Sequence, residues 1–388
     1  MRCINCLDNS LHPLGQLIDD AGLCSGCNTH KEKDIINWGD KLNYLNDKCS
    51  KVLATKKNRP YDCIIPLNAD AEDYFIVELA LQLNLRPLLV QVNSYFGTEL
   101  SWKNLHNLET HFDLDMITFN PNILHYKEAV RSSLRKFNSI YWPFQALKTS
   151  YPVKLALDMK IPLILWGGLQ ATEQSGKFSH HDEVEMSSWS RVEHDLFSVN
   201  EKNFFTTGVQ LKERNQTPYI YPQVDIAKKV TGIYLSNYIR WDPWKQNNDM
   251  LKYGFEPEKN FNTFDNYERS GSSVYYEIHD LLRLEKHGYR KVRDHLSREI
   301  RHGRVTTSHA KKLYKKYVNQ QVNVEPFFKW LGASKTGTKS FLNKRIVKNQ
   351  KLIGLEKTYV DPKIYFSEGF FPDGYLPERS YLNYFKGI

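Results

Sequence analysis

A short apolar run followed at once by an amphipathic pattern constrains the fold more than any other feature of the chain. Residues 61–67 are mostly apolar, as in a parallel strand that is buried on both faces. From about Glu72 to Leu83 the apolar positions instead recur at helical spacing. The sequence therefore predicts a strand–loop–helix unit. Such a unit suits phosphate, because backbone N–H groups and the helix dipole converge at the helix N-terminus.

The loop of this unit is acidic where a phosphate-binding loop would contain glycine. Glycine lets a phosphate approach the backbone closely, whereas each carboxylate repels it by about 1 to 4 kcal/mol at about 4 Å, depending on the local dielectric. Two interpretations stay open: the acids hold Mg²⁺ in an altered phosphate site, or they cap the helix, where the dipole favours negative charge. The six loop residues are Asn68, Ala69, Asp70, Ala71, Glu72 and Asp73.

Four of the six cysteines form two pairs, Cys3-x-x-Cys6 and Cys24-x-x-Cys27. This spacing is typical of a zinc ribbon or knuckle, in which two turns present four thiolates to one tetrahedral ion. A redox or disulfide role is the alternative, although a reducing compartment disfavours it. Since all four ligands would be cysteine, the sequence predicts a structural zinc ion with no open position for catalysis.

Strand and helix patterns continue to alternate after the first unit and predict an α/β fold, a doubly wound parallel sheet covered by helices. The expected strands span residues 86–92, 116–119 and 161–166, and the expected helices span 98–111, 123–137 and 146–159.

Ligands of such sheets bind beyond the carboxyl ends of the strands. These ends give the candidate cofactor-binding residues, whereas no residue is singled out as catalytic. Besides the loop at 68–73, the candidates are Asn93, Gly167 and Gly168.

Composition divides the chain into four predicted parts. The zinc ribbon (1–33) precedes a nucleotide-binding α/β domain (34–175). A mixed, helical and basic region that serves substrate or partner binding follows at 176–335, and an aromatic-rich tail covers 336–388.

The net charge of +9 is concentrated in residues 283–316. This stretch is either a solvated helical face or a site for an anion such as a sugar nucleotide diphosphate. Nucleic acid is the third option, but no stacking strand or groove-reading helix supports it, so no nucleic-acid partner is expected. No apolar run approaches the ~20 residues that cross a bilayer, and the N-terminus lacks an apolar signal core. We therefore expect a cytoplasmic protein.

These segments together resemble the bacterial N-acetyl sugar amidotransferase family of the PP-loop ATP pyrophosphatase (HUP-like) superfamily, over roughly residues 1–335. The resemblance rests on the paired cysteines and on segments that match in the same order. Among them are Ile64-Ile65-Pro66-Leu67, Tyr151-Pro152-Val153, Tyr238-Ile239-Arg240-Trp241-Asp242 and the stretch from Ser297 to Arg304.

The resemblance implies a role in the biosynthesis of lipopolysaccharide O-antigen or another surface polysaccharide. Members of the family activate the N-acetyl group of a nucleotide-linked sugar with ATP, with Mg²⁺ neutralising the pyrophosphate. They then accept ammonia from a glutaminase and a cyclase-like partner. The family's Ser-Gly-Gly-x-Asp-Ser loop falls on residues 68–73 of this chain.

The chain departs from the family pattern where chemistry would occur. Its loop keeps neither glycine nor serine, and the family's Cys-Trp-x-Cys-His segment is Tyr141-Trp142-Pro143-Phe144-Gln145 here. The family's Trp-Gly-Glu is Trp166-Gly167-Gly168, and its Gly-Tyr-Gly-Arg is Gly288-Tyr289-Arg290-Lys291. Two hypotheses follow: an ATP-dependent amidotransferase with an altered loop, or a catalytically inactive relative (a pseudoenzyme) that binds a sugar nucleotide or a partner subunit such as an intact paralogue.

Overall fold

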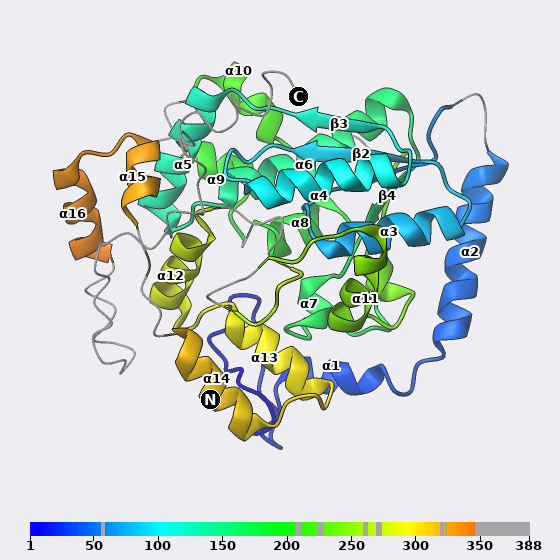
Figure 1. Cartoon of the computed structure of the whole chain (residues 1–388), viewed down its shortest axis with the longest axis horizontal. Coiled ribbons are helices and arrows are strands. Elements are labelled where there is room, and N and C mark those ends of the chain that lie inside the picture. The colour runs from blue at the N-terminus through cyan, green and yellow to red at the C-terminus, as the bar shows by residue number, and fades with distance from the viewer. Residues whose placement is uncertain are drawn as a thin grey trace.

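The centre of the molecule is a five-stranded, fully parallel sheet with the strand order β3-β2-β1-β4-β5 (Figure 1). The computed structural model describes residues 1–55, 59–196, 198–206, 211–222, 229–258, 263–268, 274–318, 322 and 324–345. The strands are β1 (Cys63–Pro66), β2 (Pro87–Val92), β3 (Met116–Phe119), β4 (Leu163–Trp166) and β5 (Thr231–Tyr234).

Helices cover both faces of this sheet, because alternate side chains of each strand point to opposite sides. Ile65 of β1 belongs to a core cluster with Ala80 of α3 and Leu105 of α4. Its neighbour Ile64 instead packs in a cluster with Val153 of α6. The chain runs outward from β1 in one direction and returns through β4 in the other, so the predicted doubly wound parallel sheet is confirmed.

The helices in the first half of the chain are α1 (Ser25–Glu32), α2 (Trp38–Ala54), α3 (Ala71–Gln82), α4 (Glu99–His111), α5 (Ile123–Phe137), α6 (Trp142–Met159), α7 (Gln170–Glu173) and α8 (Ser188–His194). Those that follow are α9 (Glu201–Thr206), α10 (Glu213–Gln216), α11 (Pro243–Asp249), α12 (Tyr276–His287), α13 (Val292–Arg301), α14 (Thr307–Val318), α15 (Glu325–Leu331) and α16 (Lys335–Arg345).

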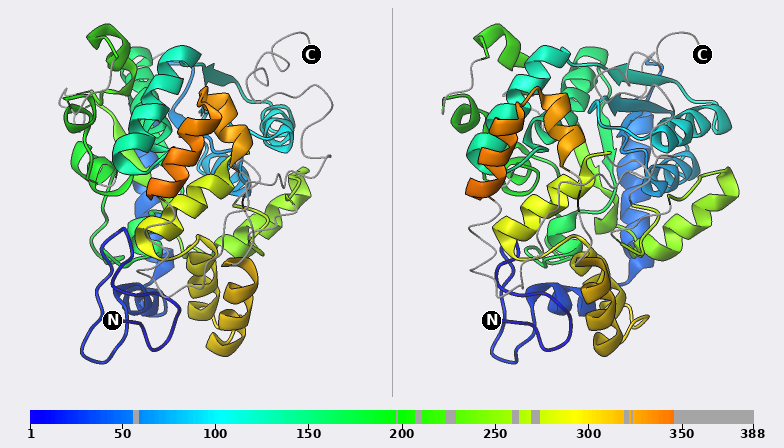
Figure 2. Two further views of the ribbon diagram at one scale, coloured as in Figure 1. Left: turned by 90° about the vertical axis from the view of Figure 1, so that its left-hand side faces the viewer. Right: turned by 60° about the vertical axis from the view of Figure 1, so that its left-hand side comes forward.

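The cysteine-containing N-terminal segment packs beside α13 and α14 at one end of the molecule (Figure 2). The four paired cysteines share a buried cluster with Val292, Leu296 and Ile300 of α13 and with Ala310 of α14. Thr307 also donates a hydrogen bond to the carbonyl oxygen of Asn5. Residues that are almost 300 positions apart in the sequence therefore form one small core.

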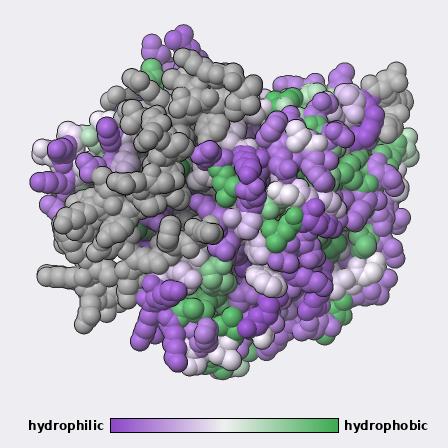
Figure 3. All heavy atoms as spheres, in the orientation of Figure 1, coloured by the Kyte–Doolittle hydropathy of each residue, from purple (hydrophilic) through white to green (hydrophobic). Residues whose placement is uncertain are grey.

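The basic stretch divides into an inner and an outer part. Arg298 and Arg301 of α13 lie largely buried in ion pairs. The lysines of α14 are exposed and contribute to the hydrophilic surface, of which one face is drawn in Figure 3. These exposed lysines are Lys311, Lys312, Lys315 and Lys316.

Among the described residues, no helix is long and apolar enough to cross a membrane. Of the predicted aromatic tail, residues 336–345 lie within α16, and residues 346–388 lie outside the described part.

Candidate functional site

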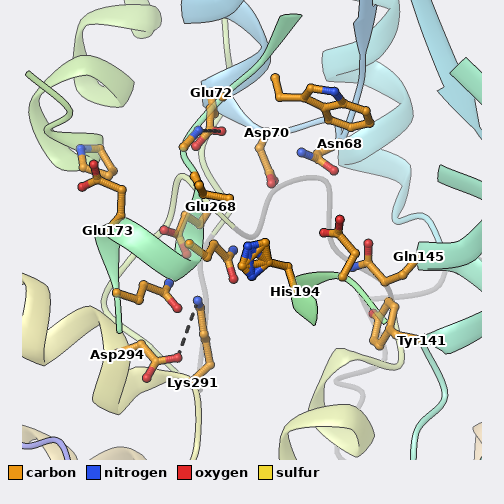
Figure 4. Close-up of a pocket in the computed structure, with 18 of the residues that line it drawn as sticks. Asn68, Asp70, Glu72, Tyr141, Gln145, Glu173, His194, Glu268, Lys291 and Asp294 are labelled. Atoms are coloured by element: carbon orange, nitrogen blue, oxygen red, sulfur yellow. Dashed lines mark hydrogen bonds and ion pairs between the residues drawn. The ribbon is translucent and has the colours of Figure 1, made fainter. Parts of the chain in front are cut away.

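A cavity of about 370 Å³ opens beyond the carboxyl ends of β1 and β4, where the direction of the chain through the sheet reverses (Figure 4). This is where ligands of doubly wound sheets bind. The cavity brings together six of the candidate residues from the sequence, whereas Ala69, Ala71 and Asp73 are buried in the protein and do not line it. The six are Asn68, Asp70, Glu72, Asn93, Gly167 and Gly168.

Backbone N–H groups of the loop between β1 and α3 bind the carboxylate of Asp73, which belongs to the same segment. Asp73 is fully buried, and its Oδ2 accepts hydrogen bonds from the backbone N–H groups of Asn68 (2.8 Å), Ala69 (2.6 Å) and Asp70 (3.3 Å). Ala69 adopts φ = 64°, a left-handed conformation that favours glycine. The donors that a phosphate-binding loop would direct at its ligand are thus directed at Asp73. Of the two interpretations of the acids, the geometry of Asp73 is that of a helix cap.

Glu72 points the other way, toward the end of β4. Its Oε1 accepts a hydrogen bond from the N–H of Gly168 at 3.1 Å. A Cβ atom on Gly167 would lie only 1.8 Å from this same oxygen, and a Cβ atom on Gly168 would lie 2.6 Å from the indole Nε1 of Trp241. Burial raises the pKa of Glu72 to about 7, although the Gly168 N–H opposes that shift. Gly167 therefore provides the space for a carboxyl group that can hold or release a proton near neutral pH, and Gly168 provides the space for the indole of Trp241.

His194 and Asp195, at the end of α8, lie on the cavity wall and were not identified from the sequence. His194 is 7% exposed, and neither ring nitrogen has a hydrogen-bond partner in the described part of the chain. Burial lowers its pKa to about 4, so the ring is neutral at pH 7. Burial raises the pKa of Asp195 to about 6, with Lys148 opposing the shift. Figure 4 places His194 near the centre of the labelled side chains.

The opposite wall comes from α12 and α13. Asp294 lies among three nitrogen-bearing side chains: Nε2 of His12 at 3.4 Å, Nζ of Lys291 at 3.7 Å and Nη1 of Arg283 at 4.0 Å. The backbone N–H of Lys291 donates to Asp280 at 2.6 Å, which fixes this segment. This wall therefore brings Lys291, Arg283 and Asp294 to the cavity, opposite the acidic loop.

Asn93, the last of the predicted site residues, joins the ends of two strands. It is buried, and its side-chain amide donates to Oδ1 of Asn120 at 2.8 Å. Its own Oδ1 accepts a hydrogen bond from the N–H of Tyr95. Asn93 thus links the two segments that form the cavity rim beyond β2 and β3.

The four paired cysteines form a candidate metal centre. All four are buried, and their sulfur atoms lie within 4.8 Å of one another. Cys3 and Cys27 are 3.8 Å apart, and Cys6 and Cys24 are 3.5 Å apart. Tetrahedral zinc with Zn–S bonds of about 2.3 Å needs S···S separations of about 3.8 Å. The four sulfurs could therefore bind a metal such as zinc.

An arginine and several N–H groups contact the cysteine sulfur atoms, as expected around a metal bound by thiolates. The guanidinium of Arg301 lies 3.6 Å from Sγ of Cys24 and 3.9 Å from Sγ of Cys6. The backbone N–H of Cys24 donates to Sγ of Cys3, and the side-chain amide of Asn5 donates to Sγ of Cys27. Four thiolates around one divalent ion carry excess negative charge, so a cation and N–H donors in the outer shell stabilise it.

A second group of possible metal ligands consists of Asp265, Glu268 and His295. The two acids of this group are already paired with an arginine. The guanidinium of Arg298 contacts Asp265 at 2.5 Å and Glu268 at 2.9 Å. His295 bonds Glu268 at 2.7 Å. This group is a polar network that positions Glu268 on the cavity wall.

Residues 258–352 match the family model described as LPS biosynthesis protein WbpG-like, C-terminal domain. This match confirms the expected relationship to proteins of lipopolysaccharide biosynthesis. Among solved structures, that of NMN synthetase from Francisella tularensis is similar at 15% sequence identity, with 59% of this chain and 88% of that chain covered and a TM-score of 0.29. No curated protein matches the chain.

Proposed function

We propose that the chain binds a nucleotide-linked sugar in its cavity without adenylating it through the loop at 68–73, since its residues 258–352 match the WbpG-like model of LPS biosynthesis proteins. This is the second of the two hypotheses from the sequence, a non-adenylating relative of the N-acetyl sugar amidotransferases. The observation that supports it most directly is the carboxylate of Asp73 on the loop N–H groups.

ATP would have to displace that carboxylate before the loop could hold its pyrophosphate. Three N–H groups that bond a buried carboxylate are charge-assisted donors, roughly twice as strong as neutral ones. Because Asp73 belongs to α3 itself, displacing its carboxylate would also break one half of the capping box that it forms with Asp70. A nucleotide that uses this loop must therefore first break these three hydrogen bonds, although burial raises the pKa of Asp73 to about 6 against their effect.

The cavity offers polar groups suited to a sugar instead. Gln145 and Asn68 supply amide donors and acceptors, and His194 supplies a neutral imidazole. Glu72 can accept a hydrogen bond when ionised and donate one when protonated. Hydroxyl and acetamido groups need this mixture of donors and acceptors.

The proposal assigns zinc a structural role at Cys3, Cys6, Cys24 and Cys27 and assigns no chemistry to ATP or Mg²⁺. The partners that we propose are a glutaminase or cyclase-like subunit, or an intact paralogue that supplies the missing chemistry. We also propose a cytoplasmic location.

An amidotransferase with an altered loop is the second candidate, and one observation favours it. The family's carboxylate after Trp-Gly is missing at Gly168, yet the carboxyl group of Glu72 lies beside that residue. An acidic group therefore remains at this corner of the cavity.

Calorimetry on the zinc-loaded protein tests the proposal, with UDP-N-acetylglucosamine and Mg·ATP titrated separately. We expect the sugar nucleotide to bind and Mg·ATP to show no heat up to millimolar concentration. The Asp73→Asn variant keeps the size of the side chain but removes its charge. Titrating it with Mg·ATP shows whether that charge affects ATP binding. Micromolar binding of Mg·ATP to the wild type would contradict the proposal and favour the amidotransferase.

A further inference from the structure

From the charge distribution in the cavity we infer that Lys291 and Arg283 form an anion subsite, which takes the diphosphate of the bound nucleotide-linked sugar. The inference rests on the proposed function and adds an orientation to it. The phosphates lie against the WbpG-like part of the chain, and the sugar lies toward Glu72 and His194. The phosphate site has thus moved away from the loop at 68–73.

The two walls of the cavity carry opposite net charge. The wall from residues 258–352 contributes four arginine or lysine side chains and two acids, whereas the remaining lining residues contribute two lysines and four acids. The first set is Arg283, Lys291, Arg298, Arg301, Glu268 and Asp294; the second is Lys33, Lys148, Asp70, Glu72, Glu173 and Asp195. Among the lining side chains, basic groups therefore outnumber acidic ones on the first wall only, although acids behind that wall (Asp8, Asp265 and Asp280) pair with its arginines.

Two cations on the first wall are already held at close range. Arg298 contacts Asp265, Glu268 and Glu299, each within 2.9 Å. Arg301 contacts Asp8 at 2.6 Å. These arginines have their anions, so they offer little to a ligand.

Lys291 and Arg283 have looser ion pairs. Lys291 is 7% exposed, and the carboxylate nearest to its Nζ, that of Asp294, is 3.7 Å away, beyond hydrogen-bond length. Nη1 of Arg283 is buried without a hydrogen-bond partner in the described part of the chain, and its two nearest carboxylates, Asp280 and Asp294, are 3.9 Å and 4.0 Å away.

Figure 4 shows the ammonium group of Lys291 directed into the cavity, with the dashed line to Asp294 beside it. The desolvation free energy of a buried cation is offset only when an anion reaches hydrogen-bond distance. A phosphate oxygen between Lys291 and Arg283 would supply charge-assisted hydrogen bonds to both. Each of the two cations thus has a carboxylate nearby but none at hydrogen-bond distance, and a phosphate can supply that contact.

Binding of inorganic pyrophosphate, followed by calorimetry without Mg²⁺, tests the subsite directly. We expect Lys291→Gln to weaken pyrophosphate binding about tenfold or more, since a charge-assisted hydrogen bond is lost. Lys311→Gln removes the same charge from the exposed face of α14 and should change the affinity less than about twofold. Lys148→Gln, on the opposite wall, should weaken pyrophosphate binding less than Lys291→Gln does.

Asp294→Asn provides a test in the opposite direction, which a misfolded variant cannot imitate. Removing the competing carboxylate should strengthen pyrophosphate binding severalfold and enlarge the increase in melting temperature that pyrophosphate causes. Lys291→Arg should retain most of the affinity, because it retains the charge.

Equal affinities of Lys291→Gln and Lys311→Gln, or no pyrophosphate binding by the wild type up to millimolar concentration, would overturn the subsite. UDP-N-acetylglucosamine separates this outcome from failure of the proposed function. If the wild type binds the sugar nucleotide and Lys291→Gln binds it equally well, the subsite is wrong and the proposed function stands. If pyrophosphate binds through Lys291 but the sugar nucleotide does not bind, the subsite stands and the proposed function is wrong.

Discussion

Asp73 and Glu72 are adjacent in sequence but have opposite roles. Asp73 points into the protein and holds the loop N–H groups, whereas Glu72 points toward Gly168 and the cavity. The sequence shows three acids in the loop but not the direction of each side chain, so capping and Mg²⁺ binding both stayed open. His194 and Asp195 were missed for a related reason: a histidine and an acid in a polar stretch form no motif until α8 places them on the cavity wall.

At this scale, replacing Asp73 tests the cap. Asp73→Ala leaves three loop N–H groups, one of them fully buried, without their acceptor and should lower the free energy of unfolding by about 2 to 4 kcal/mol. Urea unfolding followed by circular dichroism measures this change. Asp47→Ala, at an exposed position of α2, should stay within about 0.5 kcal/mol of the wild type. An equally small effect at Asp73 would show that the cap is not stabilising.

Glu72 should make stability depend on pH. Burial raises its pKa from 4.5 to about 7 in the folded protein. A raised pKa in the folded state stabilises the fold below pH 4.5, and that stabilisation is lost as the pH rises through 7. The wild type should therefore lose on the order of 3 kcal/mol relative to Glu72→Gln between about pH 4.5 and pH 8. Glutamine retains an acceptor for the Gly168 N–H.

Unfolding of both proteins by urea across this pH range measures the difference. The exposed Glu213→Gln variant serves as the control for the loss of a carboxyl group. A constant difference between wild type and Glu72→Gln from pH 4.5 to 8 would show that Glu72 does not titrate in this window.

At the scale of elements, sequence periodicity was sufficient for the α/β part. The strand at 116–119 and the helix at 123–137 coincide with β3 and α5, while α6 begins four residues earlier than expected, at Trp142. Strand β5 was not assigned, because four residues that begin with Thr231 and Gly232 show neither a long apolar run nor alternation. Its pairing with β4 over residues 163–166 makes it a strand, and that pairing is a long-range contact.

The contact between the end of β4 and α3 can be tested at Gly167. Gly167→Ala should destabilise the protein by more than about 2 kcal/mol or expel Glu72, because the new methyl group would overlap Oε1 of Glu72. Truncating that partner should relieve the clash, so Gly167→Ala with Glu72→Ala should be more stable than the two single changes predict by addition. Additive free energies of unfolding in this double-mutant cycle would contradict the close contact.

At the scale of the whole molecule, Arg301 connects the cysteine-containing N-terminal segment to the cavity. This side chain contacts two cysteine sulfurs and Asp8, and it donates to the carbonyl oxygen of Gln174, on the cavity rim, at 2.7 Å. No local pattern in the sequence indicates this connection, because its parts come from three distant segments. The spacing of the cysteines did suffice to predict their convergence.

Zinc content and stability should change together. The wild type should carry a single zinc ion per chain, measured by elemental analysis. Cys24→Ser should lose the metal and melt several degrees lower, because metal binding in such sites is coupled to folding. Cys49→Ser is the matched control, since Cys49 is also buried but lies outside the cluster, and it should keep the zinc. Full zinc content in Cys24→Ser would contradict the four-cysteine site.

Amide hydrogen exchange of the loop at 68–73 is the sharpest test of whether Asp73 occupies the N–H groups that would bind a phosphate. If Asp73 holds the N–H groups of Asn68, Ala69 and Asp70, these amides are protected in the protein without ligand. Mg·ATP then adds no protection, while UDP-N-acetylglucosamine slows exchange elsewhere around the cavity, including α12 and α13. Fast exchange of the three amides in the free protein, followed by strong protection when Mg·ATP is added, would contradict the account.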